Sequence, residues 1–140
     1  MITATQTAAQ LRRLRRAISK VPFANLLGIE LQEAGRGSAT LRLIVREELK
    51  QIHGVMHGGA IASLVDTATA FAIATLLANE ERVTTVNLTI NYVRPLKRGT
   101  ARAHARVLRA GRRLITVSAE VLDDDGSLAA TALSTYIKLR

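Results

Sequence analysis

Residues 57–78 read HGGAIASLVDTATAFAIATLLA, and this stretch decides the fold. After the two glycines its side chains are apolar or small, with one charged residue, Asp66. An uncharged run of this length predicts a helix that is buried on all sides. Asp is a poor helix former, and its carboxylate is costly to bury without compensating contacts. The position of Asp66 therefore indicates a chemical role.

The chain has 140 residues, 48% of them hydrophobic, which is enough for one domain with a sizeable core. It has no cysteine, which excludes a disulfide, a thiol nucleophile and a thiolate metal site. Residues 1–7 show no basic region followed by an apolar one, so we expect no secretory signal and a cytoplasmic location. A transmembrane helix is the alternative for residues 58–79, but Asp66 and the hydroxyl side chains there argue against membrane insertion.

The net charge is +9, from 20 basic and 11 acidic residues. This surplus favours an anionic partner such as nucleic acid, acidic lipid or a nucleotide-bearing small molecule. Aromatic residues make up only 3% of the chain and do not cluster in the sequence. Base stacking on an aromatic platform is therefore not predicted, and we expect no nucleic-acid partner.

Helix and strand patterns flank the central stretch. The spacing of Leu11, Leu14 and Ile18 predicts a basic amphipathic helix over residues 7–20, which Pro22 ends. A hairpin is predicted for residues 29–45, and four further strands for residues 83–93, 100–109, 113–122 and 128–139. No second long helix can cover the far side of the sheet, so we predict an α+β fold with a curved antiparallel sheet wrapped around the central helix. We divide the chain into an N-terminal helix, 1–22, and a single domain, 23–140.

The strand predicted at residues 83–93 alternates strictly between two kinds of side chain. One face carries Val86, Leu88, Ile90 and Tyr92, and the other carries Thr85, Asn87, Thr89 and Asn91. The alternation predicts an apolar face toward the core and a polar face toward solvent or an interface.

Several short motifs occur together in a fixed order. His57-Gly58-Gly59 opens the central helix, Asp66 follows the histidine by nine positions, Tyr92-Val93-Arg94-Pro95 ends a strand, and Ala110-Gly111-Arg112 lies in a hairpin. With this order the chain resembles the hotdog-fold acyl-CoA thioesterases, above all the PaaI-type and 4-hydroxybenzoyl-CoA thioesterase branches, over about residues 26–139. The resemblance implies a hotdog fold and hydrolysis of an acyl-CoA to a carboxylic acid and CoA, with no cofactor.

Hydrolysis of a thioester needs a group that stabilises negative charge on the carbonyl oxygen. Free N–H groups at a helix start supply such donors, and glycine lets a ligand approach them closely, so the Gly58 N–H is the natural oxyanion donor. By resemblance, the Asp66 carboxylate acts either as the nucleophile or as the general base for a water molecule. The alternative is a structural aspartate bonded to threonines such as Thr67 or Thr69. His57 either polarises the thioester or caps the helix.

Two further polar residues enter through the resemblance. Gln51 lies where relatives carry a polar Asn or Gln, and its amide would hold a water or the substrate carbonyl. Thr85 matches a Ser/Thr position that helps to place the attacking water, although a strand threonine is equally ordinary. His53 and His57 have the spacing of a helical metal pair, but Gly54, Gly58 and Gly59 disfavour a helix there, so we predict no metal site.

The resemblance also implies a homodimer or homotetramer, in which the His57-Gly58 loop of one subunit faces Asp66 of the other. The phosphates of CoA would account for the positive charge. Candidate contacts are the basic residues near two turns, Arg94, Lys97, Arg98, Arg112 and Arg113.

Two other functions remain open at this stage. The same fold occurs in modules that bind acyl-CoA without hydrolysing it, and there Asp66 would have no evident purpose. It also occurs in dehydratases, which resemble different arrangements of histidine and carboxylate. The sequence does not distinguish aliphatic from aromatic acyl groups.

Overall fold

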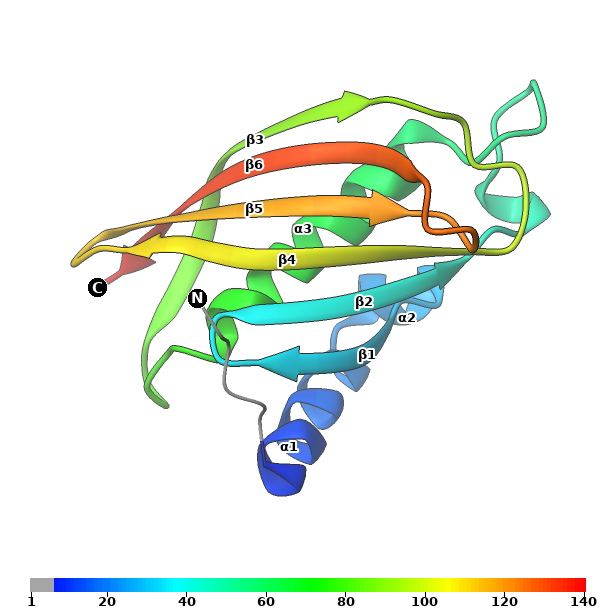
Figure 1. The fold of residues 1–140 in the computed structure, drawn as a ribbon. Helices are drawn as coiled ribbons and strands as arrows, with labels where there is room; N and C mark the ends of the chain where they lie inside the picture. The colour runs from blue at the N-terminus through cyan, green and yellow to red at the C-terminus, as the bar shows by residue number, and fades with distance from the viewer. Residues whose placement is uncertain (1–6) are drawn as a thin grey trace.

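Six antiparallel strands form one sheet that curves around a central helix (Figure 1). The structure is a computed structural model and describes residues 7–140. In the order β1-β2-β4-β5-β6-β3, the sheet contains β1 (Glu30–Gly35), β2 (Ser38–Ile44), β3 (Arg82–Tyr92), β4 (Thr100–Ala110), β5 (Leu114–Leu122) and β6 (Leu128–Leu139). The helices are α1 (Ala8–Ser19), α2 (Pro22–Leu27), a 3-10 turn (Glu47–Leu49) and α3 (Gly58–Ala74). The predicted α+β architecture is confirmed.

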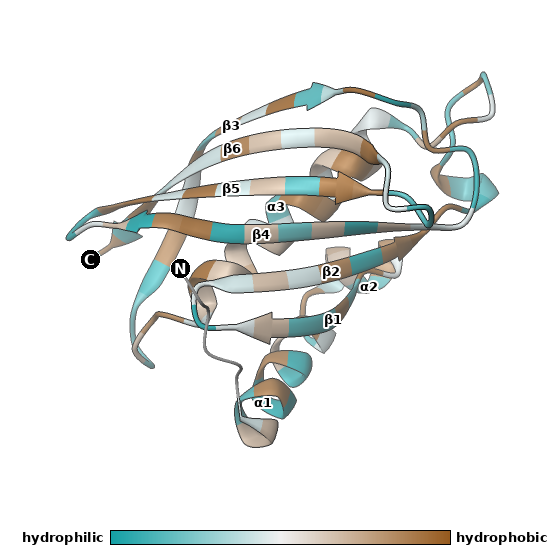
Figure 2. Cartoon of the chain, viewed as in Figure 1, coloured by the Kyte–Doolittle hydropathy of each residue, from teal (hydrophilic) through white to brown (hydrophobic). Residues whose placement is uncertain are grey.

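The core lies between α3 and the concave face of the sheet. Leu64, Val65 and Ala68 of α3 are fully buried, as are Leu41 and Val117 of the sheet. Full burial of a Leu or Val side chain contributes about 1.5–3 kcal/mol each to folding. Along the strands apolar and polar residues alternate, as Figure 2 shows, so one face of the sheet packs on α3 and the other meets water.

The prediction that the central helix is buried on all sides is wrong. A stripe along α3 stays partly or fully exposed and consists of small or polar residues: Gly59, Ala62, Ser63, Asp66, Thr67 and Ala70. One curved sheet covers only part of a helix circumference, and this stripe is the part that the chain leaves open. The helix is also shorter than predicted, because it ends at Ala74, where the Thr75 hydroxyl accepts a hydrogen bond from the Gly37 N–H at 2.7 Å.

A β-bulge at Val86 corrects the alternation predicted for β3. Thr85 pairs with Tyr136 of β6 and Asn87 pairs with Thr135, so Val86 has no partner in the ladder and is 59% exposed. A bulge shifts the alternation by one residue and re-aims the neighbouring side chains. Thr85 therefore points toward α3, whereas the prediction placed it on the outer polar face and placed Val86 in the core.

The N-terminal helix packs against β1. It begins with a capping box, in which the Thr7 hydroxyl accepts from the Gln10 N–H and the Gln10 side chain accepts from the Thr7 N–H. Leu14 and Ile18 are buried on its inner side, as the periodicity predicts. The division at residue 22 stays a prediction, and residues 1–6, which bear on the expected lack of a secretory signal, lie outside the described residues. Within residues 7–140, no helix combines the length and apolarity that crossing a membrane requires.

Candidate active site

The start of α3 presents backbone donors to an open surface. His57 is the N-cap, and its Nδ1 accepts a hydrogen bond from the Gly59 N–H at 2.7 Å. The ring proton of neutral His57 therefore lies on Nε2, which faces away from the helix. The Gly58 N–H has no intrahelical acceptor because it lies in the first turn, and no residue of 7–140 accepts its hydrogen bond. Both roles considered for His57, capping and contact with a ligand, are compatible with this geometry.

Close contacts explain the two glycines at this helix start. A Cβ atom at Gly58 would lie 3.3 Å from Cζ of Tyr92, whose hydroxyl donates to the Gly58 carbonyl oxygen at 3.0 Å. A Cβ atom at Gly59 would lie 2.9 Å from the Nδ1 atom of His57 and would displace the cap. Tyr92 is thus packed directly over the first residue of α3.

Two pockets flank these glycines. The first has a volume of about 300 Å³ and is lined by Gly58 and Tyr92 together with Val55, Met56, Ile61, Val93, Arg94 and Pro95. The second has a volume of about 220 Å³ and is bounded by Phe23 and Leu27 of α2, with Leu49, His57, Gly59, Ala60 and Ser63 among its lining residues. The first pocket contains Arg94, which forms no ion pair with another residue of the described range 7–140. In the second, the charged residues Glu48 and Lys50 are engaged in ion pairs with Arg46 and Glu47.

Asp66 lies on the open stripe of α3, two turns beyond Gly58. Its Oδ1 atom accepts hydrogen bonds from the Thr85 hydroxyl at 2.9 Å and from the Tyr136 hydroxyl at 3.2 Å. No residue in the described range donates to its Oδ2 atom. Within residues 7–140, two hydroxyl groups thus hydrogen-bond one carboxylate oxygen and no group donates to the other.

Tyr136 is 2% exposed and also lies close to the Thr69 hydroxyl, at 2.8 Å, and to the backbone carbonyl oxygen of Asp66, at 2.9 Å. Burial raises the pKa of Tyr136 to about 12, the hydroxyls of Thr69 and Thr85 oppose the rise, and the Asp66 carboxylate adds to it. Tyr136 therefore keeps its proton at physiological pH and can act as a hydrogen-bond donor.

The two parts of the site lie apart on the same helix. Eight residues separate Gly58 from Asp66, and at 1.5 Å per residue this places them about 12 Å apart along the axis. A single thioester carbonyl cannot meet the Gly58 N–H and the Asp66 carboxylate of the same chain.

Comparison with known proteins identifies the family. Residues 53–130, more than half of the chain, match the thioesterase superfamily. The chain belongs to the thioesterase superfamily. The resemblance seen in the sequence is therefore confirmed at the level of the family, and the curved sheet around α3 is its hotdog fold.

Three relatives of this superfamily member illustrate the likeness. The conserved protein PA5202 from Pseudomonas aeruginosa is 35% identical, with a TM-score of 0.84 and coverage of 89% of this chain and 98% of that one. The medium/long-chain acyl-CoA thioesterase YigI of Salmonella typhimurium is 27% identical over 153 residues, covering 97% of this chain and 99% of that protein. The PaaI protein from the phenylacetic acid degradation operon of Escherichia coli has a TM-score of 0.86 and is 22% identical, covering 96% and 97% of the two chains, and shows the shared fold.

The predicted residue Gln51 lies in the loop between the 3-10 turn and α3. Its side-chain oxygen accepts from the His53 N–H and its backbone N–H donates to Val55, so the side chain is tied into its own turn. No hydrogen bond within residues 7–140 joins Gln51 to Asp66. In this thioesterase-superfamily chain, a hydrogen bond thus links Thr85 to Asp66. Gln51 lies instead in the loop before α3, at the end of the candidate site that contains His57 and Gly58.

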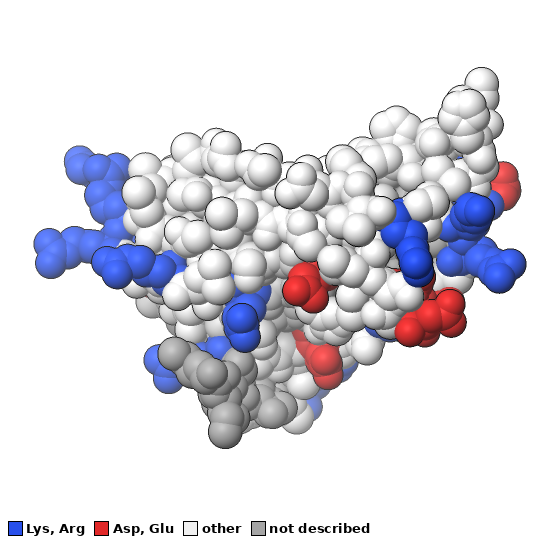
Figure 3. All heavy atoms as spheres, turned by 45° about the horizontal axis from the view of Figure 1, so that its top comes forward, with Lys and Arg blue, Asp and Glu red and all other residues white. Residues whose placement is uncertain are grey.

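The five predicted CoA contacts do not form one cluster. Arg94, Lys97 and Arg98 lie before β4, whereas Arg112 and Arg113 lie after it, and β4 spans about 33 Å at 3.3 Å per residue. Figure 3 shows basic side chains gathered at opposite ends of the visible face. On one chain, only one of these groups can contact a given CoA molecule near Gly58.

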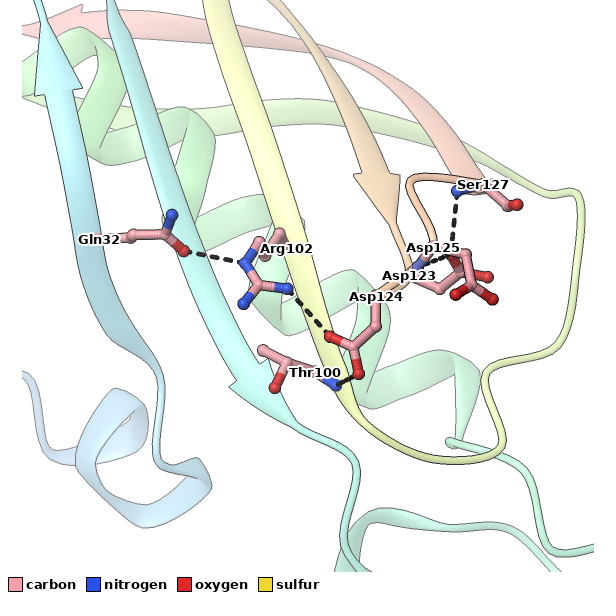
Figure 4. A network of polar contacts seen from close by, with 7 residues as sticks. All are labelled: Gln32, Thr100, Arg102, Asp123, Asp124, Asp125 and Ser127. Atoms are coloured by element: carbon pink, nitrogen blue, oxygen red, sulfur yellow. Dashed lines mark hydrogen bonds and ion pairs between the residues drawn. The ribbon is translucent and has the colours of Figure 1, made fainter.

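An acidic turn distinguishes Arg94 from its neighbours. Lys97 and Arg98 share a hollow with Asp123, Asp124 and Asp125 of the β5–β6 turn. Figure 4 shows that this turn is fixed by an ion pair from Asp124 to Arg102 at 3.1 Å, and by hydrogen bonds to Asp123 from the N–H groups of two later turn residues. The aspartates offset the charge of Lys97 and Arg98, whereas Arg94 lines the pocket beside Gly58.

Sequence reasoning missed one residue beside Asp66, Tyr136, whereas it named Thr69 as a residue that could bond Asp66. Tyr136 reaches Asp66 because it lies directly opposite Thr85 in the β3–β6 ladder. The pairing register of strands more than forty residues apart cannot be read from one sequence. The sequence does indicate that Thr69 lies near Asp66, because Thr69 follows it by three residues and so lies one turn further along the same helix.

Proposed function

We propose that this chain is an acyl-CoA thioesterase that hydrolyses its substrate to a free carboxylic acid and CoA. The observation that carries the proposal is the Asp66 carboxylate, with Oδ1 fixed by Thr85 and Tyr136 and Oδ2 free on an open helix face. A carboxylate held in this way suits a nucleophile or a general base. A CoA thioester as substrate also agrees with the cytoplasmic location expected from the sequence.

The Gly58 N–H is the proposed oxyanion donor. It has no acceptor among residues 7–140, it lies at the positive end of the α3 dipole, and a pocket opens beside it. Negative charge develops on the thioester oxygen in the transition state, and a fixed donor aimed at that oxygen lowers the barrier. The exposed His57 Nε2 is placed to contact the same group.

Asp66 can act by two routes. As a nucleophile, its Oδ2 attacks the carbonyl carbon, CoA leaves as the thiolate, and water then hydrolyses the mixed anhydride. As a general base, it takes a proton from a water that attacks the carbonyl directly. Single-turnover hydrolysis in ¹⁸O-labelled water, with enzyme in excess over substrate, tests these routes. If water attacks the Asp66 carbonyl carbon of the mixed anhydride, the label enters Asp66 and the first acid product is unlabelled, whereas the general-base route places the label in the acid product and never in Asp66.

We further propose that each site forms between two chains, in a homodimer or a tetramer built from such dimers. The separation of about 12 Å between Gly58 and Asp66 along α3 supports a site that another chain completes. The open stripe of α3 and the unpaired outer edge of β3, with Val86 59% exposed beside Asp66's partner Thr85, are the surfaces that the second chain would cover. An antiparallel pairing would bring Gly58 of one chain toward Asp66 of the other.

The two pockets beside α3 suit the two arms of an acyl-CoA. The pocket that contains Arg94 would receive the CoA arm, since CoA carries phosphates and Arg binds them with two parallel hydrogen bonds. The pocket bounded by Phe23 and Leu27 would receive the acyl group. Arg112 and Arg113 would contact CoA only if they came from the second chain.

Thiol release across a panel of short, medium, long and aromatic acyl-CoAs, followed with a disulfide-exchange dye, tests the proposal. We expect turnover by the wild type and a loss of roughly a hundredfold or more in Asp66→Asn. Asp125→Asn, the same change on an exposed turn, is the matched control and should keep wild-type turnover. Equal rates in Asp66→Asn and the wild type would refute the role of Asp66. Binding of acyl-CoA with no turnover at all would instead favour the non-catalytic binding module.

A further inference from the structure

The buried hydroxyl of Tyr136 lies between two acceptors that belong to the same residue. It is 2.9 Å from the backbone carbonyl oxygen of Asp66 and 3.2 Å from the Asp66 Oδ1 atom. The Thr69 hydroxyl lies 2.8 Å from the Tyr136 hydroxyl and 3.0 Å from the same carbonyl oxygen. Tyr136 and Thr69 are both nearly or fully buried, so water cannot replace these contacts freely.

Counting protons shows how the contacts must be shared. Each hydroxyl has one proton, so Tyr136 can donate to the carboxylate or to the carbonyl oxygen, but not fully to both. When Thr69 donates to the carbonyl oxygen, the Tyr136 proton is available to Oδ1, where an ionised carboxylate is the stronger acceptor.

We propose that Tyr136 is a positioning residue for Asp66, which together with Thr85 holds Oδ1 and leaves Oδ2 as the reacting oxygen. The inference rests on the proposed function. Thr85 and Tyr136 are directly paired across β3 and β6, and the bulge at Val86 follows immediately, so the two donors come from one fixed point of the sheet. The rigid sheet thus sets the orientation of a carboxylate carried by the helix.

A purely structural tyrosine would not need its hydroxyl group here. The ring fills space in the core, and phenylalanine would fill nearly the same space without a polar atom to desolvate. The structure offers a matched case in Ser134, two residues earlier on the same strand and 0% exposed, whose hydroxyl donates to the Asn87 carbonyl oxygen at 3.0 Å. Within the described residues, no hydrogen bond joins Ser134 to Asp66.

Steady-state kinetics of Tyr136→Phe and Ser134→Ala on the best substrate of the panel test the inference. We expect Tyr136→Phe to lower kcat by tenfold or more while KM stays within threefold, because the carboxylate is still present but no longer held. Ser134→Ala should keep kcat within twofold, although it too removes a buried hydroxyl. Thermal unfolding of both variants shows whether each is folded. A Tyr136→Phe variant with kcat within twofold of wild type, or an equal loss in Ser134→Ala, would overturn the assignment.

A double-mutant cycle with Thr69→Val gives an independent test, and the Thr69→Val single variant still serves if Tyr136→Phe does not fold. Removing the Thr69 hydroxyl leaves Tyr136 as the one side-chain donor to the Asp66 carbonyl oxygen among residues 7–140, which draws the Tyr136 proton away from Oδ1. We expect Thr69→Val to lower kcat by threefold or more in the wild type and to have little further effect in Tyr136→Phe. Effects that multiply independently would contradict the inference. If activity is lost in Asp66→Asn but unchanged in Tyr136→Phe, this inference is refuted while the proposed function stands. Full activity in Asp66→Asn would refute the proposed function.

Discussion

A single methyl group at Gly58 would test the oxyanion role of its N–H. In Gly58→Ala the new Cβ atom would lie 3.3 Å from Cζ and 3.4 Å from the hydroxyl oxygen of Tyr92. These contacts are tighter than ordinary carbon packing at about 3.5–4.0 Å, so the ring must move by a few tenths of an ångström. Tyr92 is 54% exposed and can move outward, which keeps the strain small.

Stability and activity should respond differently to this change. Replacing glycine by alanine in a helix gains up to about 1 kcal/mol, which offsets the displacement of the ring. We therefore expect a Tm within about 4 °C of the wild type. Loss of one oxyanion donor costs about a hundredfold to a thousandfold in kcat, so partial obstruction of Gly58 should cost about tenfold to a hundredfold.

Thiol release and thermal unfolding of four proteins complete this experiment: the wild type, Gly58→Ala, Tyr92→Ala and the double variant. Tyr92→Ala removes the atoms that the methyl group meets. If the methyl group obstructs the thioester oxygen itself, the double variant stays at least tenfold slower than Tyr92→Ala. Gly58→Ala activity within threefold of the wild type, or a double variant as fast as Tyr92→Ala, would refute the reasoning.

Three further predictions concern the remaining parts of the site. Thr85→Val removes one of two hydroxyl donors to the Asp66 carboxylate, the proposed catalytic group, and should lower kcat about tenfold, equivalent to about 1.4 kcal/mol, whereas Thr84→Val on the exposed side of the strand should not. The raised pKa of Tyr136, about 12 against 10.0 in the unfolded chain, stabilises the fold below pH 10, and this contribution is lost as pH rises toward 12. Urea unfolding should show the stability difference between wild type and Tyr136→Phe shrinking by up to roughly 3 kcal/mol over that range, and a constant difference would contradict the assignment. Phe23→Ala should enlarge the pocket beside α2 and shift the preferred acyl group toward longer chains, while Leu26→Ala, at a residue 70% exposed, should leave the preference unchanged.

The sequence predicted the fold well because its strongest signals are local. The uncharged run after Gly58 defined the central helix, and the alternating strands allowed few arrangements other than a sheet around it. Prediction from local sequence patterns was wrong where the structure depends on how a strand or helix packs against other elements. Strict alternation predicted Val86 in the core, because an alternating pattern does not show where a bulge interrupts a strand. The apolar composition predicted a fully buried helix, because composition does not show how far the sheet extends around it.

The candidate site was predicted in part. Gly58 and Asp66 carry signals in the sequence, a glycine at a helix start and a lone charge in an apolar run. The contact between Asp66 and Tyr136 depends on strand register, which only the folded sheet defines. The basic residues were grouped by their nearness to turns, but β4 places Arg98 and Arg112 at opposite ends of the sheet.

The distance between Gly58 and Asp66 along α3 has a consequence for mixtures of variants. If every site draws one part from each chain, dimers of Asp66→Asn alone or of Gly58→Ala alone contain only damaged sites. A mixed dimer, however, would have one site that carries both changes and one that carries neither. Unfolding and refolding equal amounts of the two variants together should therefore restore about a quarter of the wild-type activity, as expected when half of the dimers are mixed. Two inactive variants would thus regain activity by forming mixed dimers. A site contained within one chain could not regain activity in this way.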